Sequence, residues 1–317
     1  MSNAEALQNQ SVPTMVFVGV TTGKSSIMKV FPKWSDVLGI GAQIVGYDCP
    51  IHAPDEDYLA IVRHIKADPL TKGALVTTHK IDLLTATRQE FGYLDPYAQI
   101  CGEISSISKR GSQLRGHAKD PISSGLSLEA FVPRGHWGDS GGHVLCLGAG
   151  GSAVAISVYL AGLPDKADRP SKFIAVNRSP GRLESLREIV EELDTDIEFE
   201  YILNEDPVQN DAIMAALPPG SMVINATGMG KDRPGSPVTD EAVWPERGLV
   251  WELNYRGELD FMHQARRKAD QYGLTIEDGW VYFLHGWTQV VAEVFDVQLT
   301  PELFRKLDAA ASELRPA

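Results

Sequence analysis

The sequence predicts an α/β protein built from two parallel-sheet units, and three observations support this prediction. Short apolar runs alternate with amphipathic runs of helical length along most of the chain, which is typical of strands joined by right-handed helical crossovers. The chain has 317 residues, which is enough for about two domains. A Gly- and Pro-rich stretch at residues 133–142 separates the two series of alternating elements.

The first unit is expected to contain three strands alternating with three helices. Strands are predicted at residues 15–19, 43–47 and 73–77, and helices at residues 27–38, 57–67 and 81–90. The chain begins with polar residues and has no apolar signal segment. We therefore expect a disordered lead-in at residues 1–13 and a domain at residues 14–125.

The second unit begins with an apolar strand that runs into a glycine turn and then an apolar helix, at residues 143–160. Further strands are predicted at residues 173–176, 198–202, 222–225 and 249–253, with helices at 183–193 and 211–217. This order is typical of a doubly wound, nucleotide-binding sheet, which we place at residues 126–257. Helices at 260–272, 288–297 and 301–314 make residues 258–317 a helical segment that is expected to pack back on the first domain.

Composition and charge argue against several classes of protein. Hydrophobic residues make up 43% and charged residues 22% of the chain, which excludes disorder of the whole chain. The net charge of −13 argues against binding to nucleic acid or to anionic lipid, and no apolar run is long enough to span a membrane. Three widely spaced cysteines form neither a disulfide framework nor a zinc pattern, so a reducing cytoplasm is the expected location: Cys49, Cys101 and Cys146.

The loop Gly148-Ala149-Gly150-Gly151 connects the apolar strand to its helix, with Ser152 in the first turn. Glycines let the backbone approach a pyrophosphate closely, and a helix N-terminus offers unpaired N–H groups and the positive end of its dipole. A tight turn without a ligand is the alternative. The strand before the loop and the βαβ continuation after it favour dinucleotide binding.

The end of the next strand indicates which dinucleotide is bound. NAD sites usually place a carboxylate there for the ribose 2′-hydroxyl, whereas an arginine accommodates the 2′-phosphate of NADP. Asn177, Arg178 and Ser179 occupy this position, so the sequence favours NADP over NAD, with a solvated arginine as the alternative.

Two other loops also follow apolar strands. Asn225-Ala226-Thr227 lies where a nicotinamide ribose would bind, although an ordinary turn has the same composition. The segment from Gly19 to Ser25 is similar to a phosphate-binding P-loop, but only three residues separate its glycines where a P-loop needs four. A nucleoside triphosphatase is therefore disfavoured.

Lys80 follows the third predicted strand, where burial or a nearby carboxylate could tune it for proton transfer. The alternative is an ordinary surface lysine. Asp120 is a candidate partner, or equally a helix N-cap.

Taken in order, these motifs resemble those of the shikimate/quinate dehydrogenases over residues 14–300. The resemblance depends on the segments 19–25, 76–80, 102–107, 120, 148–151, 177–179, 225–227 and 278–279. It implies an N-terminal α/β substrate domain, a Rossmann-type NADP-binding domain and C-terminal helices that pack on the first domain. It also implies a metal-free dehydrogenase in which Lys80 moves the proton and Asp120 positions it. The implied substrate-binding side chains are Ser25, Thr77, Ser105 and Tyr255, with Lys29 as a further candidate.

The substrate motifs depart from the family pattern more than the cofactor motifs do. Ser25-Ser26-Ile27 lacks the second serine of the family's carboxylate-binding motif, and Ser105 replaces an asparagine. We therefore expect shikimate to be a poor substrate, and a cyclic polyhydroxy acid or related polyol to be the small-molecule partner. A weakly catalytic NAD(P)-binding metabolite sensor is the alternative, a methylene-tetrahydrofolate dehydrogenase fits less well, and a homodimer is left open.

Overall fold

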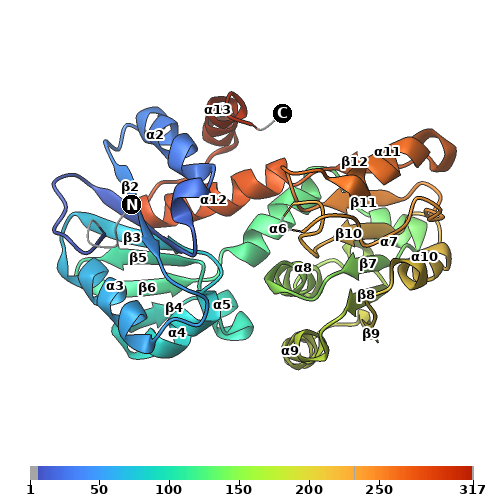
Figure 1. The fold of residues 1–317 in the computed structure, drawn as a ribbon, viewed down its shortest axis with the longest axis horizontal. Helices are drawn as coiled ribbons and strands as arrows, with labels where there is room; N and C mark the ends of the chain where they lie inside the picture. The colour runs from blue at the N-terminus through green and yellow to red at the C-terminus, as the bar shows by residue number, and fades with distance from the viewer. Residues whose placement is uncertain (1–5, 232, 316–317) are drawn as a thin grey trace. The chain divides into compact units, whose positions relative to one another are not determined.

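The computed structural model describes residues 6–231 and 233–315 (Figure 1). The chain forms two compact units: unit 1 contains the residues up to Asp120 together with Gly286–Arg315, and unit 2 contains Pro121–His285. Each unit holds one six-stranded sheet with helices on its faces. The predicted α/β fold is therefore confirmed. The chain passes between the units within or beside two helices, α6 (Asp120–Glu129) and α12 (Trp280–Phe295).

The sheet of unit 1 is mixed, with strand order β2-β1-β3-β5-β6-β4. Its parallel part contains the three predicted strands, β1 (Thr14–Gly19), β2 (Gln43–Asp48) and β3 (Thr71–Val76). The remaining strands are β4 (Phe91–Leu94), β5 (Ser106–Arg110) and β6 (Gln113–His117). β5 is antiparallel to both β3 and β6. The sequence did not predict this hairpin, because its strands carry Ser, Lys, Arg and Gln instead of an apolar run.

Helices cover both faces of this sheet. They are α2 (Ile27–Leu38), α3 (Asp55–Ala67), α4 (Lys80–Thr87), α5 (Pro96–Cys101) and α13 (Pro301–Ser312), with 3-10 turns η1 (Thr22–Lys24) and η2 (Arg88–Glu90). Val16 and Val18 of β1 share a buried cluster with α3 and α4. Phe17 points to the other face, where its ring meets Trp287 of α12 edge to face at 5.0 Å. Successive side chains of β1 thus pack into the apolar layers on opposite faces of the sheet.

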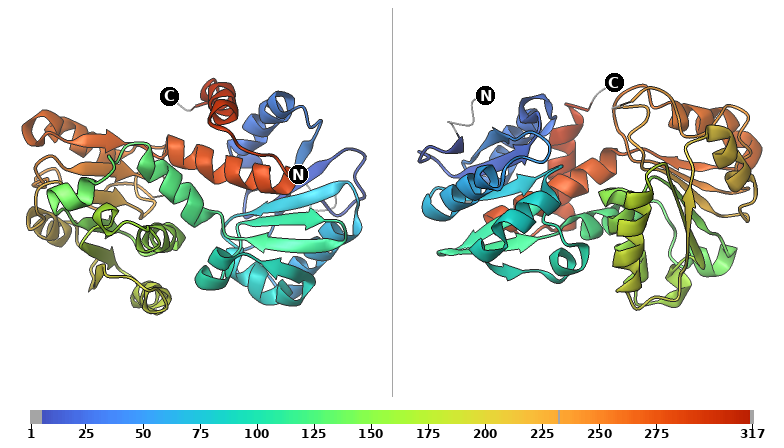
Figure 2. Two further views of the ribbon diagram at one scale, coloured as in Figure 1. Left: turned by 180° about the vertical axis from the view of Figure 1, so that it is seen from behind. Right: turned by 60° about the horizontal axis from the view of Figure 1, so that its bottom comes forward.

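The C-terminal helix α13 lies alongside α2 (Figures 1 and 2). The indole N–H of Trp34 in α2 donates a 2.7 Å hydrogen bond to the backbone O of Leu307. Trp34 is fully buried, so this contact satisfies the only polar atom of a large core side chain.

The sheet of unit 2 is all parallel, with strand order β12-β11-β10-β7-β8-β9. Its strands are β7 (Val144–Leu147), β8 (Lys172–Asn177), β9 (Glu198–Leu203), β10 (Met222–Asn225), β11 (Leu249–Glu252) and β12 (Thr275–Glu277). The order reverses at β7 and β10, as expected for a doubly wound sheet.

Two layers of helices enclose this sheet. Val144 and Cys146 face the helices on one side, and Leu145 and Leu147 face those on the other. The first layer contains α8 (Gly151–Ala161) and α9 (Pro180–Glu191), and the second contains α10 (Pro207–Ala215) and α11 (Asp260–Tyr272). The short helices α7 (His136–Ser140) and η3 (Lys166–Asp168) complete the unit.

The structure corrects two expectations about the ends of the chain. Residues 1–5 of the expected disordered lead-in lie outside the described residues. The rest of that segment packs on unit 1, because Ala6 is fully buried and the backbone N–H of Gln10 donates to Asp68 at 3.3 Å.

The segment 258–317 was expected to belong wholly to the first domain, but its first half belongs to unit 2. β12 pairs in parallel with β11, and α11 packs on both strands. β12 has only 3 residues, which is too short to give a strand signal in the sequence. Gly286–Arg315 do return to unit 1.

We predict that Gly73 in β3 cannot carry a side chain. An added Cβ would overlap the backbone O of Ile107 on the neighbouring β5, and this atom cannot move without disturbing the β3–β5 pairing. Gly73→Ala should lower the free energy of unfolding by about 2–3 kcal/mol, measured by chemical denaturation. Gly23→Ala is the control, because nothing lies within 4 Å of its added Cβ. Equal stability of the two variants would contradict the prediction.

Candidate functional site

Three loops of unit 1 meet at one edge of its sheet. β1 and β3 are parallel neighbours that end at Gly19 and Val76. β5 runs the opposite way, so it begins where they end, and the N–H of Val76 donates to the backbone O of Ser105 at 2.9 Å. The carboxyl ends of parallel strands are where open α/β sheets bind ligands.

Lys80 and Asp120 are brought together at this edge. Thr78 adopts a left-handed conformation with φ 58°, which turns the chain sharply from β3 into α4, where Lys80 is the first residue. Asp120 is the first residue of α6. The Lys80 Nζ donates a hydrogen bond to the Asp120 Oδ2, and each side chain is 19% exposed. The pair is therefore held in place while still open to a small molecule.

Glu103 is a third member of this cluster, and the sequence analysis missed it. Its Oε1 lies 3.7 Å from the Lys80 Nζ, and its side chain is 9% exposed. Burial raises the pKa of Glu103, and the nearby Asp120 carboxylate raises it further, whereas Lys80 lowers it. The sequence gives no local signal for this role, because Glu103 approaches Lys80 only through the pairing of β3 with β5.

The expected substrate-binding side chains of unit 1 differ in exposure. Ser25 and Thr77 are half-buried in the loops after β1 and β3. Ser105 is only 3% exposed, and its Oγ accepts a 2.8 Å hydrogen bond from the N–H of Lys119. Ser105 therefore supports the residue just before Asp120. Lys29 is exposed on α2.

The loop after β1 is anchored on the protein's own carboxylate. The N–H and Oγ1 of Thr22 both donate to Asp48 Oδ1, at 2.8 and 2.6 Å. A P-loop would direct such groups at phosphate. This geometry agrees with the sequence argument against a triphosphatase.

A buried ionic cluster supports the segment that leads to Asp120. Glu293 of α12 accepts from Lys119 Nζ at 2.9 Å and lies 3.2 Å from the Nε2 of His117. Hydrogen bonds from His117 and Lys119 hold the pKa of Glu293 well below its usual range. Burial disfavours the imidazolium of His117, but its hydrogen bonds to Asp95 and Glu293 outweigh this effect and raise its pKa.

In unit 2 the glycine loop has the geometry that a dinucleotide requires. Gly148 has φ 122°, and an added Cβ would lie 2.5 Å from the backbone O of Ala226. In contrast, nothing lies within 4 Å of a Cβ added to Gly150, which caps α8 without any side-chain hydrogen bond. The N-terminus of α8 is thus bare, and the residues fit a pyrophosphate at this point.

The loop Asn225-Ala226-Thr227 is shaped by buried contacts. Asn225 is fully buried; its Oδ1 accepts from the Oγ1 of Thr227 at 2.7 Å, and its Nδ2 donates to Glu252 at 2.8 Å. Glu252 also accepts from the backbone and side chain of Asn254, at 2.9 and 2.6 Å. Burial raises the pKa of Glu252 to about 7, despite these donated hydrogen bonds. Asn225 therefore shapes the loop from inside, and Glu252 is a supporting residue that the sequence analysis missed.

The remaining predicted residues of unit 2 lie at or near strand ends. Arg178 follows β8, is exposed, and has no hydrogen bond or ion pair within the described part of the chain. Its neighbours are fixed, because the N–H of Ser179 donates to the Asn177 Oδ1 at 3.2 Å. Ser152 receives a 3.2 Å hydrogen bond from Tyr282, and the ring of Tyr255 packs on Phe283 at 4.6 Å.

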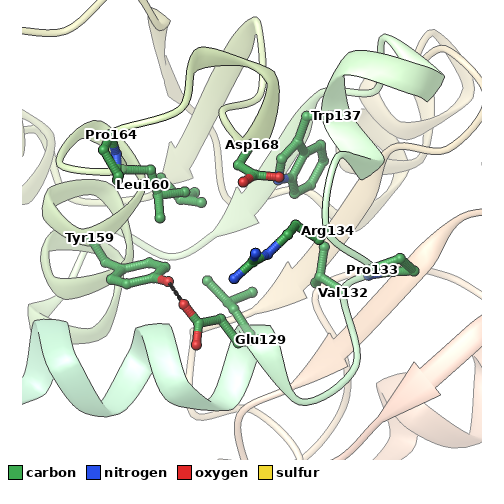
Figure 3. Close-up of a pocket in the computed structure, with 11 residues that line it drawn as sticks. Glu129, Val132, Pro133, Arg134, Trp137, Tyr159, Leu160, Pro164 and Asp168 are labelled. Carbon is green, nitrogen blue, oxygen red and sulfur yellow. Dashed lines mark hydrogen bonds between the residues drawn. The ribbon is translucent and has the colours of Figure 1, made fainter.

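A separate cavity of about 370 Å³ opens at the other end of α8 (Figure 3). Tyr159 and Leu160, near the C-terminus of that helix, form one wall, and Figure 3 shows Arg134 extending into the cavity. Tyr159 donates a hydrogen bond to Glu129. None of the residues predicted to bind cofactor or substrate lines this cavity.

The cysteines, the possible metal ligands and the length of the helices also bear on the class of protein. Cys49, Cys101 and Cys146 are free and buried, and burial raises the pKa of Cys146 to about 12. Within residues 6–231 and 233–315, no three His, Cys, Asp or Glu side chains are arranged to hold a metal ion. No helix in these ranges is long and apolar enough to cross a membrane.

Comparison with curated sequences finds proteins named shikimate dehydrogenase (NADP(+)), although no family model matches the chain. Identity to the Streptococcus thermophilus protein is 27%, over 55% of this chain and 57% of that protein. Identity to the Symbiobacterium thermophilum protein is 31%, over 61% and 62%. The match thus spans less than two thirds of these relatives. A longer match, to the Rhodopseudomonas palustris protein, has 27% identity over 84% and 85%.

Solved structures resemble the whole chain. Quinate dehydrogenase from Corynebacterium glutamicum, in complex with NAD, has a TM-score of 0.74 at 15% identity and covers 95% of this chain and 99% of its own. A shikimate dehydrogenase in complex with NADP+ has a TM-score of 0.73 at 19% identity, over 100% and 98%. The 5-ketofructose reductase of Gluconobacter has a TM-score of 0.71 at 19% identity, over 96% and 99%. These neighbours establish the fold, and with the curated relatives they confirm the resemblance inferred from the motifs.

We predict that the two glycines of the loop after β7 play different roles. Gly148→Ala should lower both the melting temperature and the affinity for NADP, because its Cβ strikes the backbone of Ala226. Gly150→Ala should leave the melting temperature unchanged but weaken NADP about 10-fold or more, because only a bound pyrophosphate would meet its Cβ. Thermal unfolding and fluorescence titration measure the two effects. Normal NADP affinity in Gly150→Ala would contradict the assigned site.

Proposed function

Since the chain is related in sequence and in fold to the shikimate and quinate dehydrogenases, we propose that it is an NADP-dependent dehydrogenase acting on a secondary alcohol. The observation that carries this proposal is the Lys80–Asp120 ion pair at the carboxyl edge of the unit 1 sheet. The bare helix N-terminus behind Gly150 in unit 2 supplies the second requirement, a cofactor site.

The residues of unit 1 provide proton transfer. NADP, when bound, accepts or supplies the hydride. In ketone reduction Lys80 donates a proton from its Nζ to the carbonyl oxygen, and in alcohol oxidation it takes one from the hydroxyl. Asp120 accepts a hydrogen bond from Lys80 and so orients it. A positioned acid or base of this kind contributes about two to four decades in rate.

Arg178 supports the choice of NADP over NAD. It is exposed directly after β8, is not engaged by any described carboxylate, and lies in the turn closed by the hydrogen bond from Ser179 to Asn177. A guanidinium with free donors matches a 2′-phosphate in a paired geometry.

The substrate we propose is a cyclic polyhydroxy acid or related polyol, with its ketone. Ser25, Thr77 and Tyr255 are the hydroxyl groups assigned to it. Ser105 is a weaker candidate for direct contact, since its Oγ is engaged by Lys119. The engaged hydroxyl of Ser105 and the missing second serine after Ser25 leave shikimate with fewer hydrogen-bond partners. Both observations support the expectation that shikimate binds poorly.

A metabolite sensor remains the second candidate, because the substrate motifs differ from those of the family. The maintained Lys80–Asp120 contact favours the enzyme, since a sensor has no chemical need for both groups. A cytoplasmic location is a further part of the proposal, and a homodimer is left open. The three buried free thiols are compatible with a reducing compartment.

We expect Arg178→Asp to weaken NADP binding by about one to two decades while NAD changes little, because the variant loses a charged hydrogen bond and gains repulsion. Titration of both cofactors measures the difference. Arg134→Asp is the control: it makes the same charge change at an exposed position of unit 2 that lines the separate cavity. A wild-type protein that prefers NAD would show that Arg178 has been misassigned.

We expect Lys80→Met to lower kcat by about two to four decades with little change in NADP affinity. Asp120→Asn should lower kcat less, because an amide can still hold the substrate. The double variant should lose less than the sum of the two single losses on a logarithmic scale, since both act on one proton. Steady-state kinetics with cofactor titration test this, and near-normal turnover in Lys80→Met would remove the mechanism.

A further inference from the structure

Glu103 lies between α5 and β5 and faces the catalytic lysine from the protein interior. It is followed by Ile104, which is fully buried, and the N–H of Ile104 donates to the backbone O of Lys80 at 3.3 Å. This backbone contact ties the segment that carries Glu103 to the start of α4. The resulting 3.7 Å separation of the Glu103 Oε1 from the Lys80 Nζ is therefore set by the sheet edge.

The cluster contains one ammonium group and two carboxylates. Asp120 already accepts a hydrogen bond from Lys80, so a second ionised carboxylate at Glu103 would leave a negative charge without a full partner. Such a charge is costly at a side chain that is 9% exposed. The cluster therefore takes up an additional proton more readily than a lysine–aspartate pair alone, and Glu103, the less exposed carboxylate, is where that proton resides.

We infer that Glu103 is the proton-exchange partner of Lys80, a positioning residue that restores the charge state of the lysine after each turnover. This inference rests on the dehydrogenase function proposed above. It adds a role for a side chain that does not itself touch the substrate.

The proton balance is simple in either direction. In ketone reduction, an N–H bond of Lys80 breaks as the alcohol O–H forms, which leaves a neutral amine. The carboxylic O–H of Glu103 then breaks and restores the ammonium, and the carboxylate is reprotonated from solvent. In alcohol oxidation each step is reversed, and the substrate's proton passes through Lys80 to Glu103.

The resting geometry is compatible with this exchange. The 3.7 Å between the Lys80 Nζ and the Glu103 Oε1 is longer than a hydrogen bond, which needs about 2.7–3.2 Å. The lysine side chain has four flexible carbons and three N–H donors, so a small movement of the Nζ closes the gap. The ionisable groups that act on Glu103 or respond to it are Lys80 of α4, Asp120 of α6 and Cys101 of α5.

A purely structural ion pair is the competing explanation, and Glu103→Gln separates the two. The amide keeps the size of the side chain and can still accept a hydrogen bond from Lys80, but it cannot release a proton. Glu103→Asp keeps a carboxyl group that can hold and release a proton, but its side chain is one carbon shorter. Glu90→Gln is the matched control, because Glu90 pairs with Arg63 and Lys66 away from the sheet edge.

The first measurement is the pH profile of kcat for NADPH-dependent reduction of a panel of polyhydroxy ketones. We expect Glu103→Gln to lower kcat by about 10- to 100-fold and to alter the pH profile, with NADPH affinity unchanged. Glu103→Asp should recover part of the rate and the wild-type profile. A Glu103→Gln enzyme with wild-type kcat and pH profile would overturn the inference.

The second measurement needs no turnover. Trinitrobenzenesulfonate reacts with neutral amines, and peptide mass spectrometry reports its modification of Lys80 between pH 7 and pH 10. At pH 8–9 an acid has given up its proton more completely than at pH 7, so there the ionised Glu103 stabilises the Lys80 ammonium, whereas the amide of Glu103→Gln carries no charge. Modification at pH 8–9 should therefore be about 3- to 10-fold faster in Glu103→Gln. Unchanged modification would overturn the inference. Faster modification in a protein that reduces no ketone would support the Lys80–Glu103 coupling and refute the proposed function.

Discussion

The direction of β5 decides whether Lys80 and Asp120 meet. Lys80 follows β3, and Asp120 comes much later in the chain, after β6. Because β5 runs antiparallel to β3, it starts at the edge where β3 ends, and the β5–β6 hairpin then brings His117 back opposite Ser106 at the same edge. Asp120 therefore arrives beside Lys80. A shift of one residue in the pairing of β3 with β5 would turn every side chain of β5 to the opposite face of the sheet.

Buried polar contacts hold the loops of both units in shape. In unit 1, Glu293 binds Lys119 and His117, and the hydroxyl of Ser105 accepts from the same lysine's backbone. In unit 2, Glu252 accepts three hydrogen bonds and so fixes Asn225 and Asn254. A charged or amide group in such a place is costly unless it is fully paired. These residues therefore act as supports that fix the conformation of the loops that carry the candidate site residues.

Sequence reasoning was most successful where local pattern and fold agree. In unit 2, apolar strands and the glycine turn predicted β7, β8, β10 and β11 to within one or two residues, since parallel strands buried on both faces are continuous apolar runs. The edge strand β9 was predicted as closely, although none of its residues is fully buried. In unit 1 the polar hairpin β5–β6 and the short β4 gave no such signal. β12 has only three residues and depends on pairing with β11, which no local pattern encodes.

The residues of the candidate site likewise fall into those that the sequence identified and those that depend on tertiary contacts. Lys80 and Asp120 were assigned through the resemblance to the dehydrogenase family, and the structure brings them into contact. Glu103 and Glu252 were missed because their importance comes from burial beside partners distant in sequence. Ser105 was identified, but its hydroxyl is occupied by Lys119, which depends on tertiary contacts that spacing does not reveal.

The most direct test of the account is isotope transfer from NADPH that carries deuterium at the transferable position of its nicotinamide. The protein is incubated with this cofactor and a panel of cyclic polyhydroxy ketones, and mass spectrometry measures deuterium in the alcohol products. The account predicts one deuterium on the new carbinol carbon with the wild-type protein, and almost none with Lys80→Met, although that variant still binds NADPH. NADPH binding without transfer to any ketone, or undiminished transfer by Lys80→Met, would contradict it.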